Sequence, residues 1–234
     1  MSEQKVAIVT GGGRGMGAAI ARELHDAGYR LALMSPSGSA EALARELGGV
    51  GVGGSVLEAA DLKRLFDATM AAYGRVDAVV NHTAHPPKGA LLDIADDDWH
   101  LGLEMMLLNV IRLCRLVTPV MATQGGGGIV NISTFAAFEP EPFLPVSCTI
   151  RAALSTFTML YARRYAEAGI RMNCLLPGYI DSLPQSDETV AGIPMRRIGS
   201  VAEIAKTTAF LLSDGAGYIT GQSLRVDGGV TRHV

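Results

Sequence analysis

The feature that most constrains this chain is a regular alternation of short apolar segments with longer stretches of helical periodicity. The apolar segments are rich in Val, Ile and Leu, and they run from Lys5 to Thr10, Arg30 to Met34, Val50 to Gly53, Val76 to Asn81, Gly128 to Ser133 and Ile170 to Leu176. Strands that are apolar on both faces occur in parallel sheets with helices on both sides. The alternation therefore predicts an α/β fold, a doubly wound parallel β-sheet with helices on both faces.

Helices are expected between these strands. They are predicted to run from Met16 to Ala27, Ala40 to Leu47, Leu57 to Tyr73, Asp97 to Met121, Val146 to Ala168 and Val201 to Leu212. Residues 183–195 contain Pro184 and Pro194 among polar residues, which is typical of a mobile loop beside a ligand crevice. No repeat or linker divides the chain, so residues 1–234 are expected to form a single domain.

Composition and charge narrow the function classes. The formal net charge of the 234 residues is −3, and no run of Lys or Arg forms the basic stripe that nucleic acids or membrane surfaces require. Cys114, Cys148 and Cys174 are scattered without a C-x-x-C pair, which favours a reducing cytoplasm and argues against a disulfide scaffold or a metal site. The first residues are polar, and no segment approaches the ~20 apolar residues of a membrane span. We expect a cytoplasmic protein that binds a small-molecule substrate.

A glycine-rich turn follows the first predicted strand. The sequence Thr10-Gly11-Gly12-Gly13-Arg14-Gly15-Met16-Gly17 leads directly into the first predicted helix. Glycines let the backbone approach a pyrophosphate, while the new helix directs its N–H groups and the positive end of its dipole at the phosphates. A turn in this position predicts a dinucleotide site in a Rossmann-like fold, with Thr10, Gly11, Gly13, Arg14, Gly15, Met16 and Gly17 as cofactor-binding residues.

The spacing T-G-x-x-x-G-x-G resembles that of the short-chain dehydrogenase/reductase family, and the resemblance extends over essentially the whole chain. Asn81-His82-Thr83-Ala84 is similar to the family's N-N-A-G, and Ile129 to Ser133 reads as its I-V-N-I-S strand. Pro177 to Ser182 resembles the P-G-x-x-x-T turn that holds the nicotinamide carboxamide, and residues 218–222 and 226–229 resemble the closing segment. The resemblance implies further cofactor-binding roles for Asn81, Pro177, Gly178, Ile180 and Ser182.

The same resemblance implies where a catalytic set of Asn, Ser, Tyr and Lys should lie. Counting from flanking matches places Arg151 at the lysine position, Ser147 at the tyrosine position and Thr134, next to Ser133, at the serine position. The asparagine position falls on Met106, and Asn109 lies about one helical turn later. The chain is therefore expected to be a divergent member with an atypical active site, in which Thr134, Ser147, Arg151, Ser133 and Asn109 are the candidate catalytic residues.

These replacements change the chemistry that the site can perform. The Ser147 hydroxyl is shorter than a phenol and ionises far less readily, so it is not expected to protonate a substrate in the usual place. Arg151 retains a positive charge that can hold ribose hydroxyls or an anionic substrate, but a guanidinium does not relay protons. His82 and His85, after the fourth predicted strand, are alternative proton donors because histidine titrates near neutrality.

The end of the second predicted strand bears on the choice of nucleotide. It reads Met34-Ser35-Pro36-Ser37 and lacks the acidic residue that accepts hydrogen bonds from the 2′-hydroxyl of NAD. Arg14 can meet a 2′-phosphate, and Ser35 and Ser37 can serve either nucleotide. The sequence therefore mildly favours NADP(H) over NAD(H).

Three functions remain open from the sequence. The first is an NAD(P)(H)-dependent oxidoreductase that acts on a small carbonyl or alcohol. The second is a dinucleotide-binding protein without redox chemistry, such as a sensor, a partner subunit or an inactive relative. The third is a cofactor-independent lyase or dehalogenase-type catalyst. In each case the resemblance implies a homodimer or homotetramer formed through the helices Asp97 to Met121 and Val146 to Ala168.

Overall fold

The computed structural model describes residues 4–232, and its centre is a seven-stranded sheet in the order β3-β2-β1-β4-β5-β6-β7. All neighbouring strands run parallel. The strands are β1 (Val6–Thr10), β2 (Arg30–Ser35), β3 (Val50–Gly53), β4 (Ala78–Asn81), β5 (Gly127–Ile132), β6 (Ile170–Pro177) and β7 (Ser223–Val226). The predicted doubly wound α/β fold is confirmed, and the ends of the predicted domain, residues 1–3 and 233–234, lie outside the described residues.

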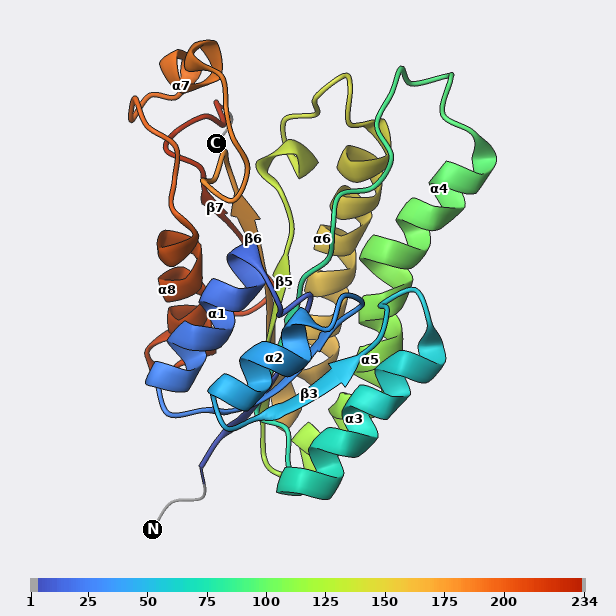
Figure 1. Ribbon diagram of the computed structural model, residues 1–234, viewed down its shortest axis with the longest axis vertical. Coiled ribbons are helices and arrows are strands. Elements are labelled where there is room, and N and C mark those ends of the chain that lie inside the picture. Colours follow the sequence, from blue (N-terminus) through green and yellow to red (C-terminus); the bar gives the residue numbers. More distant parts are fainter. Residues whose placement is uncertain (1–3, 233–234) are drawn as a thin grey trace.

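Two helical layers cover the sheet because successive residues of each strand point to opposite faces (Figure 1). Ala7 and Val9 of β1 pack with α1 (Gly15–Asp26), α2 (Ser39–Glu46) and α8 (Val201–Leu212). Ile8, between them, packs with α3 (Ala59–Tyr73), α5 (Asn109–Thr123) and α6 (Pro145–Tyr165). This alternation explains why the strands are apolar throughout.

The order of the strands fixes where a ligand can bind. β1 pairs with β2 on one side and β4 on the other, so the chain changes direction across the sheet between them. Ligands of such sheets bind at the carboxyl ends of the strands beside this switch point. The loops that follow β4, β5 and β6 rise at that end of the molecule, opposite the N-terminus (Figure 1).

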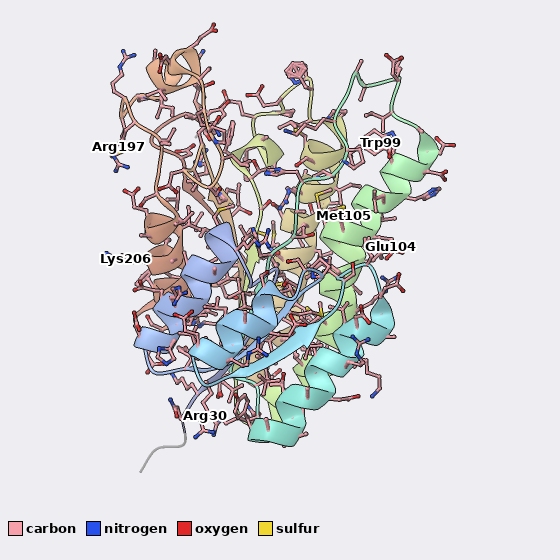
Figure 2. All side chains as sticks on the ribbon, in the orientation of Figure 1. Arg30, Trp99, Glu104, Met105, Arg197 and Lys206 are labelled. Atoms are coloured by element: carbon pink, nitrogen blue, oxygen red, sulfur yellow. The ribbon has the colours of Figure 1, made fainter. Side chains whose placement is uncertain are left out.

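The predicted helix from Asp97 to Met121 is a continuous helical stretch with a distortion in the middle. It comprises α4 (Asp96–Leu103), a π-helical segment η1 (Glu104–Leu108) and α5, and Figure 2 labels Trp99, Glu104 and Met105 along it. By length and composition alone this stretch could cross a membrane, a test that core helices of soluble proteins also pass, and 44% of its most apolar window is buried. Charged residues such as Glu104 and Arg112 interrupt its apolar residues, so the sequence alone predicts no membrane span there.

Two short elements near the end of the chain were not predicted. Residues 183–195, expected to be a loop, contain the six-residue helix α7 (Asp187–Gly192), which begins where the Ser186 hydroxyl accepts a hydrogen bond from the Thr189 N–H. β7 has four residues and adds to the edge of the sheet beside β6. α7 is too short for the periodicity that reveals longer helices, and Ser223 and Arg225 interrupt the apolar pattern in β7 that marks the other strands.

Candidate functional site

The glycine loop joins β1 to α1 in a conformation that only small residues permit. Gly15 has a φ of +50°, and a Cβ atom on Gly17 would lie 2.0 Å from the Gly11 carbonyl oxygen. Arg14 precedes α1, and its side chain does not cap the helix. The N–H groups in the first turn of α1 therefore remain available to an anion, which fits the phosphate role predicted for Thr10 to Gly17.

The start of the loop after β4 is fastened to the glycine loop. The Thr10 hydroxyl donates a hydrogen bond to the His82 carbonyl at 2.9 Å and accepts one from the His82 N–H at 3.0 Å. The His82 Nδ1 lies 3.4 Å from the Gly11 carbonyl oxygen. Burial, followed by the positive charge of Arg151, lowers the pKa of His82 to about 4. His82 is therefore a neutral side chain under the glycine loop at neutral pH.

Three serine hydroxyls lie together at the end of β2. Ser39 Oγ is 3.1 Å from Ser35 Oγ and 2.9 Å from Ser37 Oγ, and Ser35 Oγ also accepts a hydrogen bond from the Ala40 N–H. A Cβ atom on Gly13 would lie 2.0 Å from Ser39 Oγ, so this serine cluster touches the glycine loop next to Arg14. Ser39 was not predicted, although the alternation of serines at positions 35, 37 and 39 was visible in the sequence.

Two cavities meet along the carboxyl ends of the strands. The first, the serine-side cavity of about 210 Å³, is lined among others by Gly11, Met34, Ser35, Ser55, His82 and Met105. The second, the arginine cavity of about 270 Å³, is lined by Arg14, Gly15, Met16, His82, Thr83, Ala84, His85, Ile132, Ser133, Arg151, Ser182 and Leu183. Because His82, Thr83 and Ala84 line both cavities, the two cavities adjoin each other beside the glycine loop.

Arg151 is the charged group of the arginine cavity that lies deepest in the protein. Its Nη1 donates a hydrogen bond to the Ile132 carbonyl at 2.6 Å, and its buried Nε has no partner among the described residues. Burial lowers the pKa of Arg151 to about 10, so the guanidinium remains protonated at neutral pH. Ser133, at the end of β5, also has a buried hydroxyl without a described partner.

The other candidate catalytic residues do not line this cavity. Thr134 caps the short 3-10 helix η2 (Phe135–Ala137) by accepting a hydrogen bond from the Ala136 N–H. Ser147 is buried on α6, one turn before Arg151. Asn109 donates a hydrogen bond to the Met105 carbonyl at 2.7 Å, inside its own helix. Of the candidate catalytic residues, the structure thus brings only Ser133 and Arg151 together.

The remaining predicted cofactor residues divide between the cavity and the core. Asn81 donates a hydrogen bond to Asn131 at 2.8 Å and belongs to a buried polar chain. Gly178 bonds to Val226 of β7, and Ile180 packs into the core, so these two residues and Pro177, the last residue of β6, support the turn. Ser182, at the end of the turn, reaches the arginine cavity.

Cys148, a further reactive side chain, has a structural role. Cys148 makes hydrogen bonds with the backbone of Glu141, and burial raises the pKa of its thiol, so a thiolate is disfavoured. Within residues 4–232, no group of three or more His, Cys, Asp or Glu side chains is arranged to hold a metal ion.

Comparisons with known proteins agree with this fold. Residues 11–231 match the family model described as enoyl-(acyl carrier protein) reductase. The chain is 31% identical over 240 residues to a 3-oxoacyl-(acyl-carrier-protein) reductase of Staphylococcus epidermidis, covering 97% of this chain and 98% of the relative. It is 34% identical over 248 residues to dehydrogenase/reductase SDR family member 4 of Bos taurus, covering 99% and 89% of the two chains.

A solved structure extends the similarity to three dimensions. A blue fluorescent protein from a metagenomic library, crystallised in complex with NADPH, superposes with a TM-score of 0.91 at 30% identity and covers 97% of this chain and 98% of its own. The family match over residues 11–231 and the superposition both cover nearly the whole chain, including the parallel sheet and the glycine loop. The chain belongs to the short-chain dehydrogenase/reductase family of oxidoreductases.

Proposed function

We propose that this protein binds NADP(H) and oxidises or reduces a small alcohol or carbonyl compound. The observation that carries the proposal is the pair of adjoining cavities, the serine-side and arginine cavities, beside the glycine loop. The two halves of a dinucleotide lie on either side of the phosphate-binding loop in such folds, and residues of the glycine loop line both cavities. The similarity to a solved NADPH complex supports the same assignment.

The residues of the site fit the parts of the cofactor. The N–H groups at the start of α1 would hold the pyrophosphate, and Ser182 and the backbone of Thr83 and Ala84 would border the nicotinamide half. When bound, the nicotinamide ring supplies or accepts a hydride. The protein itself would bind the cofactor, orient the substrate and provide or remove a proton.

The preference for the 2′-phosphate form rests on the serine cluster and Arg14. Neutral hydroxyls at the N-terminus of α2 and a guanidinium in the adjacent loop offer hydrogen bonds and positive charge to a phosphate. β2 ends in Ser35, where an NAD-selective site would place a carboxylate. We therefore assign NADP(H) as the preferred nucleotide.

Proton transfer in this site needs a source other than the usual tyrosine. By family spacing, Met106, Thr134, Ser147 and Arg151 replace the expected Asn, Ser, Tyr and Lys. Of the two histidines, His82 is fastened beneath the glycine loop, whereas His85 is an exposed residue that also lines the arginine cavity. We assign proton transfer to His85 or to water beside it, with Ser133 orienting the substrate oxygen.

Cofactor selectivity provides the first test. Titration with NADPH and NADH, followed by nicotinamide fluorescence, is expected to give tighter binding of NADPH. Arg14→Gln and Ser39→Ala should each weaken NADPH binding by on the order of 10-fold and leave NADH binding within about twofold, since hydrogen bonds to charged groups contribute about 1.5–3 kcal/mol. Arg45→Gln, in the last turn of α2 away from the cluster, is the matched control. Equal binding of both nucleotides would refute the preference.

Turnover tests the reaction itself. The wild-type protein should consume NADPH with some member of a panel of small carbonyl compounds, and His85→Gln should reduce the rate by on the order of 10²-fold without changing NADPH affinity. A competing function, dinucleotide binding without redox chemistry, is favoured by the buried position of Ser147 and by the engagement of Asn109 with its own helix. Tight NADPH binding without turnover on any member of the panel would support that alternative.

A further inference from the structure

A cavity of about 520 Å³ lies at the carboxyl ends of β6 and β7, and we call it the β7 cavity. Its lining combines three glycines and four charged residues with the side chains of Tyr179, Ile193, Met195 and Val226. Within residues 4–232 it shares no lining residue with the serine-side or the arginine cavity. Its volume is typical of small-molecule sites. A dinucleotide in the other two cavities therefore leaves the β7 cavity for another group.

The charged residues of the β7 cavity are engaged within the chain. Arg197 donates two hydrogen bonds to the Glu203 carboxylate, at 2.9 and 2.7 Å. The Asp227 carboxylate accepts two hydrogen bonds from backbone N–H groups, both at 3.0 Å. The Arg225 guanidinium lies 5.7 Å from the centroid of the Phe138 ring. These four formal charges cancel, and an ion that leaves water without gaining a partner is disfavoured, so the cavity favours an uncharged group.

The apolar part of the lining favours an aromatic ring. Tyr179 contributes a partly buried phenol ring, which packs against Phe135 with the ring centroids 5.4 Å apart. Met195 follows α7, beside this end of the sheet (Figure 1), and is 63% exposed. Its N–H donates a hydrogen bond to the Gly228 carbonyl at 3.2 Å, which ties its backbone to the turn after β7. Aromatic rings pack well against both a phenol ring and a thioether sulfur.

Two aromatic side chains link the β7 cavity to the place assigned to the substrate oxygen. Tyr179 and Ser182 belong to the same turn after β6, and Tyr179 lines the β7 cavity whereas Ser182 lines the arginine cavity. Phe135, against which Tyr179 packs, follows Ser133 by two residues, and Ser133 also lines the arginine cavity. A substrate whose oxygen lies at Ser133 can therefore extend past these rings into the β7 cavity.

From these contacts we propose that the substrate is an uncharged carbonyl compound or alcohol that carries an aromatic ring, and that the β7 cavity holds this ring against Tyr179 and Met195. The inference rests on the proposed function for the redox step, in which the carbonyl carbon gains a hydride from the nicotinamide and its oxygen gains a proton. The ring is unchanged in that step. Its removal from water contributes to binding and directs the carbonyl toward Ser133.

Binding of matched probes tests the inference without turnover. The protein is loaded with NADP⁺ and titrated calorimetrically with butan-2-one, 4-phenylbutan-2-one and 4-(3-oxobutyl)benzoate. The phenyl ketone is expected to bind on the order of 10- to 100-fold more tightly than butan-2-one, because its ring is removed from water. The benzoate, which adds a carboxylate to the same ring, should bind at least about 10-fold more weakly than the phenyl ketone, since the charge finds no partner in the cavity.

Variants of the lining locate the ring. Tyr179→Ala and Met195→Ala should each reduce the preference for the phenyl ketone over butan-2-one by at least about threefold, because each removes a contact with the ring. Tyr218→Ala is the matched control, since Tyr218 is fully exposed and lies outside the β7 cavity. Met195→Ala changes an exposed side chain, so it decides the question even if Tyr179→Ala fails to fold.

The outcomes separate this inference from the proposed function. Equal binding of butan-2-one and the phenyl ketone, tightest binding of the benzoate, or an unchanged preference in Met195→Ala overturns the inference even if NADPH binds. If NADP⁺ fails to bind, the proposed function is wrong, and the same titrations of the cofactor-free protein still decide whether the β7 cavity holds an aromatic ring.

Discussion

At the scale of single residues, the glycine loop is the part of the site that depends most strictly on side-chain size. Gly17 is buried at the start of α1, and a Cβ atom there would meet the Gly11 carbonyl carbon at 2.8 Å as well as its oxygen at 2.0 Å. Both contacts are with backbone atoms, which cannot rotate away as a flexible side chain can. A change at this position therefore has to move the loop to which we assign the phosphates.

Gly17→Ala is expected to destabilise the protein and to weaken cofactor binding. Relief of the overlap should cost about 1–3 kcal/mol of unfolding free energy, as overpacked sites usually do. The displaced loop should reduce NADPH affinity by on the order of 10-fold or more. Thermal unfolding and fluorescence titration measure the two effects. Gly192→Ala, whose added Cβ would meet no atom within 4 Å, is the control, and similar values for the two variants would contradict the expected role of Gly17.

Counting along the sequence placed residues on the right elements but did not fix the direction of their side chains. Arg151 and Ser133 were predicted site residues that do line the arginine cavity, whereas Asn109, Ser147 and Thr134 do not. Asn109 lies after the π-helical segment, and its amide bonds to the preceding turn. Such side-chain orientations depend on local hydrogen bonds and packing, which no motif spacing specifies.

At the scale of elements, the long alternating segments were predictable because each buries a periodic face, while α7, β7 and the π-helical segment were not. The serine cluster illustrates the same limit, because its three hydroxyls meet only where the chain turns from the end of β2 at Ser35 into the start of α2 at Ser39. The glycine loop was predictable because its spacing reflects backbone geometry rather than side-chain packing. The positions of short elements and of side-chain clusters could therefore be seen only in the structure.

The outer face formed by α5 and α6 is the element-scale feature most suited to contact with a second copy of the chain. It contains an apolar groove of about 690 Å³ lined by Ile111, Cys114, Arg115, Thr118, Pro119, Ala122, Phe157, Leu160, Tyr161 and Tyr165. Leu160 is 63% exposed and Met159 is 46% exposed beside it. We propose that two copies associate through these helices, since a contiguous exposed apolar face commonly marks an interface.

Leu160→Asp is therefore expected to weaken self-association by at least about 100-fold, because a buried carboxylate without a partner costs several kcal/mol. Sedimentation velocity over a range of concentrations measures the change. Leu92→Asp provides the control, because Leu92 is 93% exposed in the loop before α4 and lies outside the groove. An unchanged dimer or tetramer in Leu160→Asp would place the interface elsewhere.

At the scale of the whole molecule, His82 couples the stability of the fold to pH. Its pKa is 6.5 in an ordinary setting and about 4 in the folded protein, where burial and the charge of Arg151 oppose protonation. As the pH falls below 6.5, His82 therefore becomes protonated in the unfolded chain but stays neutral in the folded protein. The stability contributed by neutral His82 is fully present above pH 6.5 and is lost as the pH falls toward 4.

The effect of His82 on the free energy of unfolding can be distinguished from that of carboxylates by its size and its pH range. A difference of this size between the two pKa values corresponds to a loss of about 2 kcal/mol of unfolding free energy at pH 5 and about 3 kcal/mol at pH 4. The Glu203 carboxyl, whose pKa Arg197 helps to lower from 4.5 to about 2, begins to lose its contribution only as the pH falls below about 4.5. Urea unfolding of the wild type and of His82→Asn at pH 7, 6, 5 and 4 is expected to show a shallower fall in the variant. Parallel curves for the two proteins would mean that the buried position of His82 does not oppose its protonation.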